Sequence, residues 1–163
     1  MQARPDWFDA DLFPVTSRWL DVDGHTVHYV DEGSGPTLLM LHGNPTWSFL
    51  YRRLISGLRD DFRCVALDYP GFGLSTAAPG YGFTVAEHSG LVRRFVEALD
   101  LTEVTSVVQD WGGPIGMGAA ISDPDRYAGG GQPRVEALRA RCPARVDAVV
   151  QRRDLRGVEP AED

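Results

Sequence analysis

The chain has 163 residues, a formal charge of −7 at pH 7 and 43% hydrophobic residues, which suit one globular domain with a sizeable core. The acidic balance argues against nucleic acid or an anionic membrane surface as the main partner, and no run of about 18 apolar residues predicts a membrane span. We expect a cytoplasmic protein without metal or other cofactor, because no signal-peptide pattern is present and the two cysteines form no metal-ligand cluster.

The predicted elements, in chain order, are a hairpin at 17–31, a strand at 37–41, a helix at 47–59, a strand at 62–68, a helix at 84–99, a strand at 104–109 and a helix at 111–121. Apolar and polar residues alternate in the hairpin around an Asp23-Gly24 turn. The run at 37–41 is almost wholly apolar, as in a strand covered on both faces. The helix at 84–99 begins with Thr84 and Glu87 at the spacing of a capping box.

Strands that alternate with helices predict an α/β protein whose sheet is mostly parallel after the N-terminal hairpin. In such sheets, ligands bind beyond the carboxyl ends of the strands. Three loops are expected at that edge, at 42–47, 68–75 and 110–113. The functional residues are therefore expected in these three loops.

The sequence V-Q-D-W-G at 108–112 lies between a predicted buried strand and a helix, where a G-x-S-x-G nucleophile elbow would place its serine. Val108 replaces the first glycine, so the match to the general pattern is partial. Asp110 takes the place of the serine. A carboxylate needs no base to deprotonate it at neutral pH, and it can displace a leaving group from a saturated carbon to form an ester. The alternative interpretation is that Asp110 only caps the helix that follows.

Two further residues favour a catalytic role for Asp110. Asn44 lies in the loop after the third strand, which in this architecture supplies an N–H to a developing negative charge, and its side-chain amide adds a second donor. Trp111 adds an indole N–H beside the nucleophile. Neutral donors that converge near a carboxylate suit a departing halide. Taken alone, Asn44 could be a turn residue and Trp111 a core aromatic.

Three segments together resemble the haloalkane dehalogenases, a branch of the α/β-hydrolase superfamily: HGNPTWSFLYR at 42–52, DYPGFGLS at 68–75 and VVQDWGGPIGM at 107–117. The resemblance extends over about residues 13–127. It implies the N-terminal part of an α/β-hydrolase core, without the cap domain and the C-terminal strands of that fold. The implied reaction is the hydrolysis of a carbon–halogen bond in a small haloalkane by water, without a cofactor.

The resemblance also implies a role for individual residues. Asp110 would be the nucleophile, and Asn44 and Trp111 would hold the halide. His42 precedes the family's halide-binding position and is expected to be structural. The related epoxide hydrolases also use an aspartate in a similar elbow, but they usually have an aromatic residue at the position of Asn44. Asn44 therefore favours the dehalogenase over the epoxide hydrolase.

The sequence contains no candidate for the base that would hydrolyse the ester. In this superfamily the histidine base follows the nucleophile in the chain, whereas all four histidines here precede Asp110. We assign neither an acid nor a base. The sequence predicts a truncated or frameshifted chain that is deficient in turnover. A non-enzymatic short binding protein, or one that pairs with a second chain, is a further alternative.

The composition changes near residue 128. All sixteen aromatic residues lie at or before Tyr127, whereas residues 128–163 contain seven of the sixteen arginines. We predict a partial hydrolase core at 1–127 and an Arg-rich segment at 128–163 that is a weak helix or disordered. The strand at 104–109 would then be an apolar sheet edge, so we expect the isolated chain to be marginally stable or to aggregate.

Overall fold

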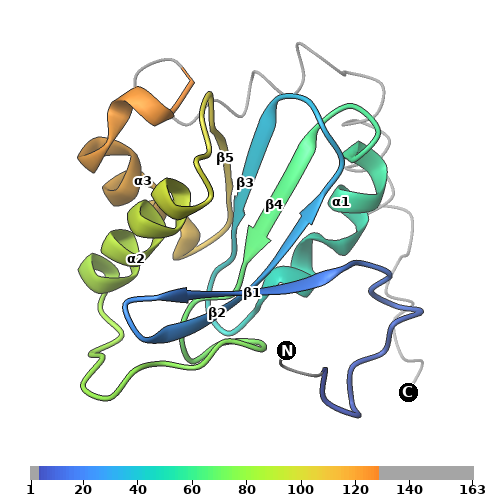
Figure 1. The fold of residues 1–163 in the computed structure, drawn as a ribbon, viewed down its shortest axis with the longest axis horizontal. Helices are drawn as coiled ribbons and strands as arrows, with labels where there is room; N and C mark the ends of the chain where they lie inside the picture. Colours follow the sequence, from blue (N-terminus) through green and yellow to red (C-terminus); the bar gives the residue numbers. More distant parts are fainter. Residues whose placement is uncertain (1–3, 129–163) are drawn as a thin grey trace, which may run out of the picture.

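The computed structural model describes residues 4–128 (Figure 1). Its strands are β1 (Ser17–Val22), β2 (His25–Glu32), β3 (Thr37–Leu41), β4 (Arg63–Leu67) and β5 (Thr105–Val108). Its helices are the 3-10 turn η1 (Ser48–Tyr51), α1 (Arg52–Leu58), α2 (Val85–Ala98), α3 (Gly112–Ser122) and the 3-10 turn η2 (Pro124–Arg126). The predicted segment 128–163 lies, apart from Ala128, outside the described residues.

The strands form one mixed sheet in the order β1-β2-β4-β3-β5. Strands β4, β3 and β5 run parallel, as predicted for the part of the chain after the hairpin. The hairpin β1–β2 joins this parallel part through an antiparallel pairing of β2 with β4. Because β3 lies between β4 and β5, the loop that follows β3 lies between the loops that follow its two neighbours.

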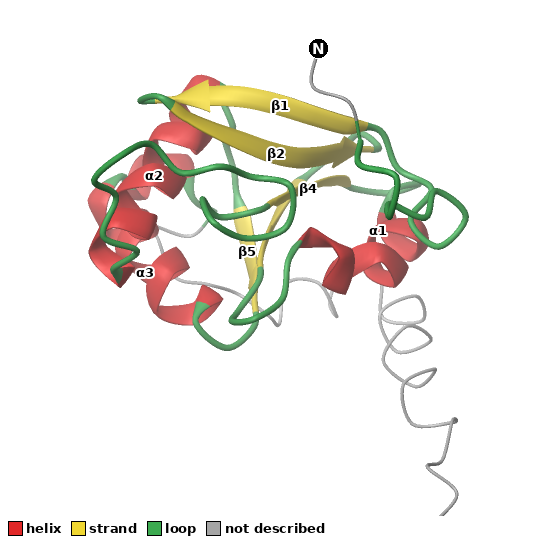
Figure 2. Cartoon of the chain, turned by 90° about the horizontal axis from the view of Figure 1, so that it is seen from below, coloured by secondary structure: helices red, strands yellow, loops and turns green. Residues whose placement is uncertain are grey.

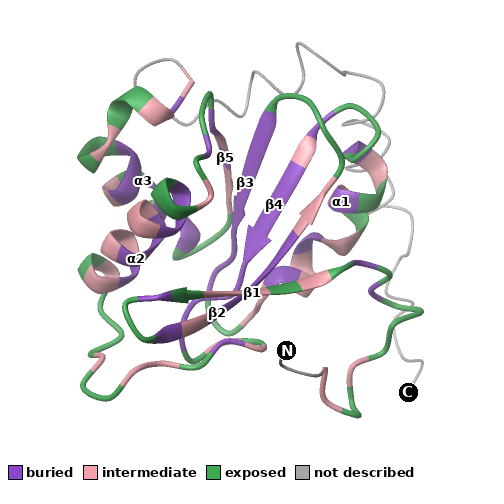
Figure 3. Cartoon of the chain, in the orientation of Figure 1, coloured by how far each residue is buried: buried purple, intermediate pink, exposed green. Residues whose placement is uncertain are grey.

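Helices cover both faces of the sheet: α1 packs on one face, and α2 and α3 pack together on the other (Figures 1 and 2). All residues of β3 are buried (Figure 3). Leu39 and Leu41 belong to the core under α2 and α3, whereas Leu38 and Met40 belong to the core under α1. Successive side chains of a strand point to opposite faces, so this apolar run fills two cores, as its sequence predicted.

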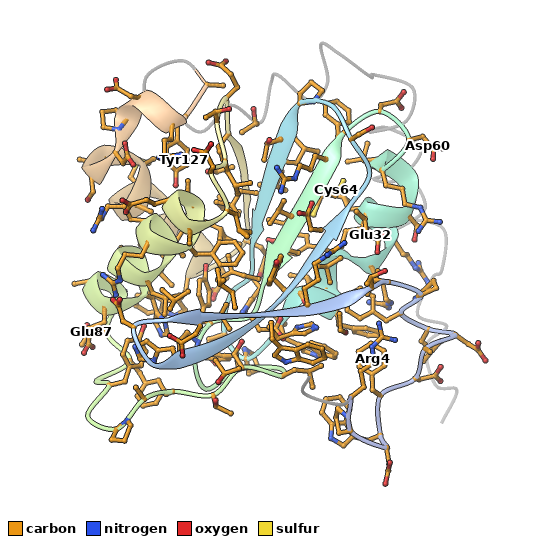
Figure 4. The ribbon with its side chains drawn as sticks, in the orientation of Figure 1. Arg4, Glu32, Asp60, Cys64, Glu87 and Tyr127 are labelled. Carbon is orange, nitrogen blue, oxygen red and sulfur yellow. The ribbon has the colours of Figure 1, made fainter. Side chains whose placement is uncertain are left out.

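The predicted capping box at the start of α2 is confirmed. The Glu87 N–H donates to Thr84 Oγ1 at 3.2 Å, and the Thr84 N–H donates to Glu87 Oε2 at 3.0 Å (Figure 4 labels Glu87). The single helix predicted at 47–59 is instead divided into η1 and α1. Trp47 is extended, and the Ser48 N–H is bound by the buried Asp68 carboxylate, so the helical segment begins only at Ser48.

Among residues 4–128, β5 is an edge strand that pairs with β3 only. The residues after η2 pair with Val104, just before the start of β5, on the side away from β3. The Val104 N–H donates to Arg126 O at 2.9 Å, and the Ala128 N–H donates to Val104 O at 3.0 Å, so Val104 and Tyr127 form a parallel bridge. No helix in this part of the chain is long and apolar enough to cross a membrane. The predicted marginal stability stays a prediction.

Candidate active site

Asp110 occupies the sharp turn between β5 and α3. Its φ of 51° lies in the left-handed region, which non-glycine residues seldom adopt but which aspartate tolerates better than most. The turn is closed by hydrogen bonds from the Gly112 N–H to Gln109 O and from the Gly113 N–H to Asp110 O, each 2.9 Å long. The carboxylate is therefore presented, exposed, beyond the carboxyl end of β5.

Glycines let the surrounding backbone approach this turn. A Cβ on Gly112 would collide with the carbonyl oxygen of Leu41, so only glycine allows α3 to begin this close to β3. A Cβ on Gly43 would lie 2.5 Å from Asp110 Oδ1 and 2.8 Å from Gln109 Oε1. The loop after β3 can therefore contact the Asp110 turn only because position 43 has no side chain.

The structure brings the three predicted site residues together. The backbone N–H of Asn44 donates to Asp110 Oδ1 at 3.1 Å. Asn44 and Trp111 line the same cavity, and both are exposed, Trp111 by 51%. The Asn44 N–H is bound to the carboxylate, so the polar groups of the two residues that remain for a ligand are the Asn44 side-chain amide and the indole N–H of Trp111. Oδ2 of Asp110 has no hydrogen bond within residues 4–128, so this oxygen is free to contact a ligand.

The cavity beside this turn has a volume of about 350 Å³. Most of its lining is apolar or aromatic, and it consists of Gly43, Asn44, Tyr69, Phe72, Phe83, Thr84, Val85, His88, Trp111 and Ile115. Nδ1 of His88 lies 2.8 Å from the Tyr81 hydroxyl, and burial lowers the pKa of His88 to about 4. The imidazole is thus neutral at pH 7, and the cavity suits a small apolar molecule.

His42 is buried and its two ring nitrogens are both bound to backbone groups. Nδ1 donates to Gly43 O at 2.9 Å, and the Tyr69 N–H donates to Nε2 at 3.2 Å. This pattern requires the neutral imidazole, and burial accordingly lowers the pKa of His42. The ring therefore connects the loop after β3 with the loop after β4.

Asp68 is a buried residue beside the site, and the sequence analysis assigned it no role. Oδ1 accepts from the Ser48 N–H at 2.8 Å, while Oδ2 accepts from the Leu74 N–H at 2.9 Å and from Nδ1 of His28 at 2.8 Å. The other ring nitrogen of His28 is bound to Ser17 Oγ at 3.0 Å. Asp68 thus fixes the start of η1 and the loop after β4. The local signals were its position at the end of a predicted strand and at the start of the segment DYPGFGLS.

The described residues contain no group of three or more His, Cys, Asp or Glu side chains that could hold a metal ion. The last histidine of the sequence, His25, accepts the Ala78 N–H at Nδ1 at 2.9 Å. Each of the four histidines therefore has a hydrogen-bond partner other than Asp110. The described residues thus combine an exposed carboxylate, neutral hydrogen-bond donors and an apolar cavity, and none of the four histidines is bound to the carboxylate.

Comparison with known proteins shows which family and which structures the chain resembles. Residues 36–129 match the family model of the alpha/beta hydrolase fold. Haloalkane dehalogenase 2 of Mycobacterium tuberculosis is 53% identical over 121 residues, which cover 74% of this chain and 42% of that protein. A cis-3-alkyl-4-alkyloxetan-2-one decarboxylase of Shewanella oneidensis is 41% identical over 118 residues, which cover 71% of this chain and 37% of that protein. The structure of haloalkane dehalogenase DatA from Agrobacterium tumefaciens superposes with a TM-score of 0.65 at 35% identity, over 69% of this chain and 38% of DatA.

Proposed function

The chain belongs to the α/β-hydrolase fold family, and we propose that its site performs the first step of a haloalkane dehalogenase reaction. The observation that supports this most is the Asn44 N–H bound to Asp110 Oδ1, with the Trp111 indole on the same cavity. The chain spans 42% of the length of the M. tuberculosis haloalkane dehalogenase that it matches at 53% identity. Because less than half of that protein is matched, the haloalkane dehalogenase activity is proposed for this chain and is not taken from the similarity.

In the proposed step, Oδ2 of Asp110 attacks the halogen-bearing carbon from the side opposite the halogen. A carbon–oxygen bond forms, the carbon–halogen bond breaks, and both of its electrons leave with the halide. The products are an alkyl ester of Asp110 and a halide ion, so no proton is transferred. The side-chain amide of Asn44 and the indole N–H of Trp111 stabilise the negative charge as it moves to the halogen.

Release of the alcohol requires water activated by a base, and these 163 residues supply no histidine for that task. His42 donates to a carbonyl and accepts a backbone N–H, and His28 is bound to Asp68 and Ser17. We infer that this chain forms the ester once and retains it. The proposal places the hydrolase part at residues 1–127 and treats 128–163 as a segment outside it.

Two alternatives concern ring-containing substrates. An epoxide hydrolase would use an attack of Asp110 on a strained, oxygen-containing ring, and the name of the Shewanella oneidensis relative gives a substrate with such a ring, but neither reaction releases a halide. The exposed amide of Asn44 favours a leaving group that departs as a separate ion. The third alternative, a non-enzymatic binding protein, would use the apolar cavity without alkylation of Asp110.

The test is to incubate the full chain with 1-bromobutane and to measure released bromide and the intact mass. We expect one bromide and one butyl group per chain, with the butyl group on the peptide that contains Asp110. Asp110→Asn should abolish both signals, whereas Asp125→Asn, at an exposed carboxylate of η2, should leave both unchanged. An adduct from an epoxide or a β-lactone, but none from 1-bromobutane, would refute the dehalogenase assignment in favour of an alternative.

A further inference from the structure

The side chain of Tyr51 connects the two strands that lead into the site. Tyr51 is the last residue of η1 and is 6% exposed. Its hydroxyl donates to the carbonyl oxygen of Leu41 at 2.7 Å and lies 3.3 Å from the carbonyl oxygen of Val107. Leu41 is the final residue of β3 and Val107 belongs to β5. The Tyr51 hydroxyl therefore contacts the carboxyl-terminal ends of two neighbouring parallel strands, β3 and β5.

Both contacted strands end within a few residues of the reacting groups. Leu41 precedes His42, Gly43 and Asn44, and Val107 lies three positions before Asp110. The Gln109 N–H also donates to the Leu41 carbonyl, at 3.2 Å. This carbonyl is thus the point at which the end of β3, the approach to the nucleophile turn and the Tyr51 hydroxyl meet.

The third loop of the site holds Tyr51 in place. The η1 turn begins at Ser48, whose N–H donates to Asp68 Oδ1 at 2.8 Å. Asp68 follows β4, so η1 is fixed to the end of β4 while its last residue contacts the ends of β3 and β5. Burial raises the pKa of Tyr51, so the phenol stays protonated and remains a donor.

We propose that Tyr51 is a positioning residue for the reaction of Asp110: its hydroxyl sets the separation between the ends of β3 and β5, and thereby keeps the Asn44 N–H on the Asp110 carboxylate. Tyr51 does not contact the reacting atoms. The effect of Tyr51 on the alkylation of Asp110 rests on the proposed function. The effect of Tyr51 on the position of the Asn44 N–H can be measured without any substrate.

The variant Tyr51→Phe removes only the hydroxyl and keeps the ring in the core under α1. Tyr127→Phe is the matched control, because the Tyr127 hydroxyl is also buried but has no hydrogen-bond partner in the described structure. The first measurement is amide hydrogen exchange in the full chain without substrate. In Tyr51→Phe, exchange at Asn44 and Gln109 should rise about five- to tenfold, the equivalent of one lost hydrogen bond. Exchange at Phe95 in α2 should not change, and Tyr127→Phe should leave Asn44 and Gln109 unchanged.

The second measurement is the alkylation of Asp110 by 1-bromobutane at increasing concentrations. Tyr51→Phe should lower the maximal rate about tenfold without changing the concentration that gives half of that rate, because the cavity is unaltered. Unchanged exchange at Asn44 and Gln109, or an equal rise at Phe95, would overturn the positioning role. If the wild-type chain is not alkylated at all, the proposed function fails, and the exchange rates still decide the role of Tyr51.

Should Tyr51→Phe not fold, the wild-type chain provides the answer by itself. The hydroxyl proton of Tyr51 should be visible by NMR, exchange slowly with water, and show nuclear Overhauser contacts to the backbone of Leu41 or His42. A hydroxyl proton that exchanges too fast to be seen would overturn the assignment.

Discussion

The backbone N–H of Asn44 donates to Oδ1 of Asp110 at 3.1 Å, although the two residues are 66 positions apart in the chain. They meet because β3 and β5 are parallel neighbours, so the loop after β3 and the turn after β5 lie at the same edge of the sheet. The bond fixes one carboxylate oxygen and leaves the other without a partner in the described structure. The orientation of the Asp110 carboxylate is therefore set by the packing of backbone segments around β3.

This packing predicts opposite effects for two adjacent glycines. Gly112→Ala should lower the free energy of unfolding by at least about 3 kcal/mol, because its Cβ would meet the Leu41 carbonyl, and backbone cannot move aside as a side chain can. Gly113→Ala should be neutral or stabilise by up to about 1 kcal/mol, since a Cβ there meets nothing within 4 Å and alanine favours the helix. Urea unfolding of both variants measures the difference. Equal losses would show that α3 does not depend on this close approach.

The buried carboxylate of Asp68 should matter far more for stability than an ion pair near the surface. Asp68→Asn replaces one acceptor oxygen by an NH2 group, which would then face N–H donors that the carboxylate now binds. This change should lower the free energy of unfolding by about 3 kcal/mol. Asp31→Asn is the control, because Asp31 binds Arg63 at 2.7 Å where both side chains are partly exposed, and should cost less than about 1 kcal/mol. Comparable losses in urea unfolding would contradict the role assigned to Asp68.

His88 should make the protein sensitive to mild acid. Its folded-state pKa lies near 4, below its ordinary value of 6.5, so the unfolded chain binds more protons between these two pH values. Stability is therefore full above pH 6.5 and is lost as the pH falls towards 4. At about 1.4 kcal/mol per pH unit, the loss approaches about 3 kcal/mol. His42, whose pKa burial also lowers, acts in the same direction.

The measurement is the free energy of unfolding in urea at pH 7 and at pH 4.5. His88→Asn removes the titrating ring and should reduce the pH dependence between these values. The loss of the contact with Tyr81 should lower the free energy of unfolding at pH 7 as well. The quantity to compare is therefore the change in this free energy between pH 7 and pH 4.5 in the wild type and in the variant. A variant with an undiminished slope would show that other groups cause the acid sensitivity.

The elements predicted best from the sequence are those with complete local signals. The strand at 37–41 was predicted with the bounds of β3, because an apolar run between Gly-Pro and His-Gly is recognisable without its neighbours. The helix at 84–99 differs from α2 by one residue at each end, because Thr84 and Glu87 form a cap entirely within the segment. The elbow pattern indicated Asp110, Asn44 and Trp111, and the family resemblance then implied a role for each; the structure brings the three residues to one edge of the sheet.

Contacts between distant segments could not be predicted in this way. His28 and Asp68 are 40 positions apart, and neither residue type indicates from sequence that the pair is buried. The hydrogen bond of Tyr51 goes to backbone carbonyls, which every residue has, so no residue pattern marks it. The hydrogen bond from the Asn44 N–H to the Asp110 carboxylate was likewise not predicted, because almost every residue has a backbone N–H.

The proposed halide donors can be separated from the residues that hold the nucleophile. Asn44→Ala keeps the backbone N–H on Asp110 but removes the side-chain amide, and Trp111→Phe keeps an aromatic ring but removes the indole N–H. Each should slow the alkylation of Asp110 by 1-bromobutane about a hundredfold, because a donor that stabilises charge only in the transition state is lost. Met117→Ala, at an exposed residue of α3, should react at the wild-type rate. Wild-type rates in both donor variants would mean that neither residue stabilises the halide. Asn44 would then not distinguish a dehalogenase from an epoxide hydrolase.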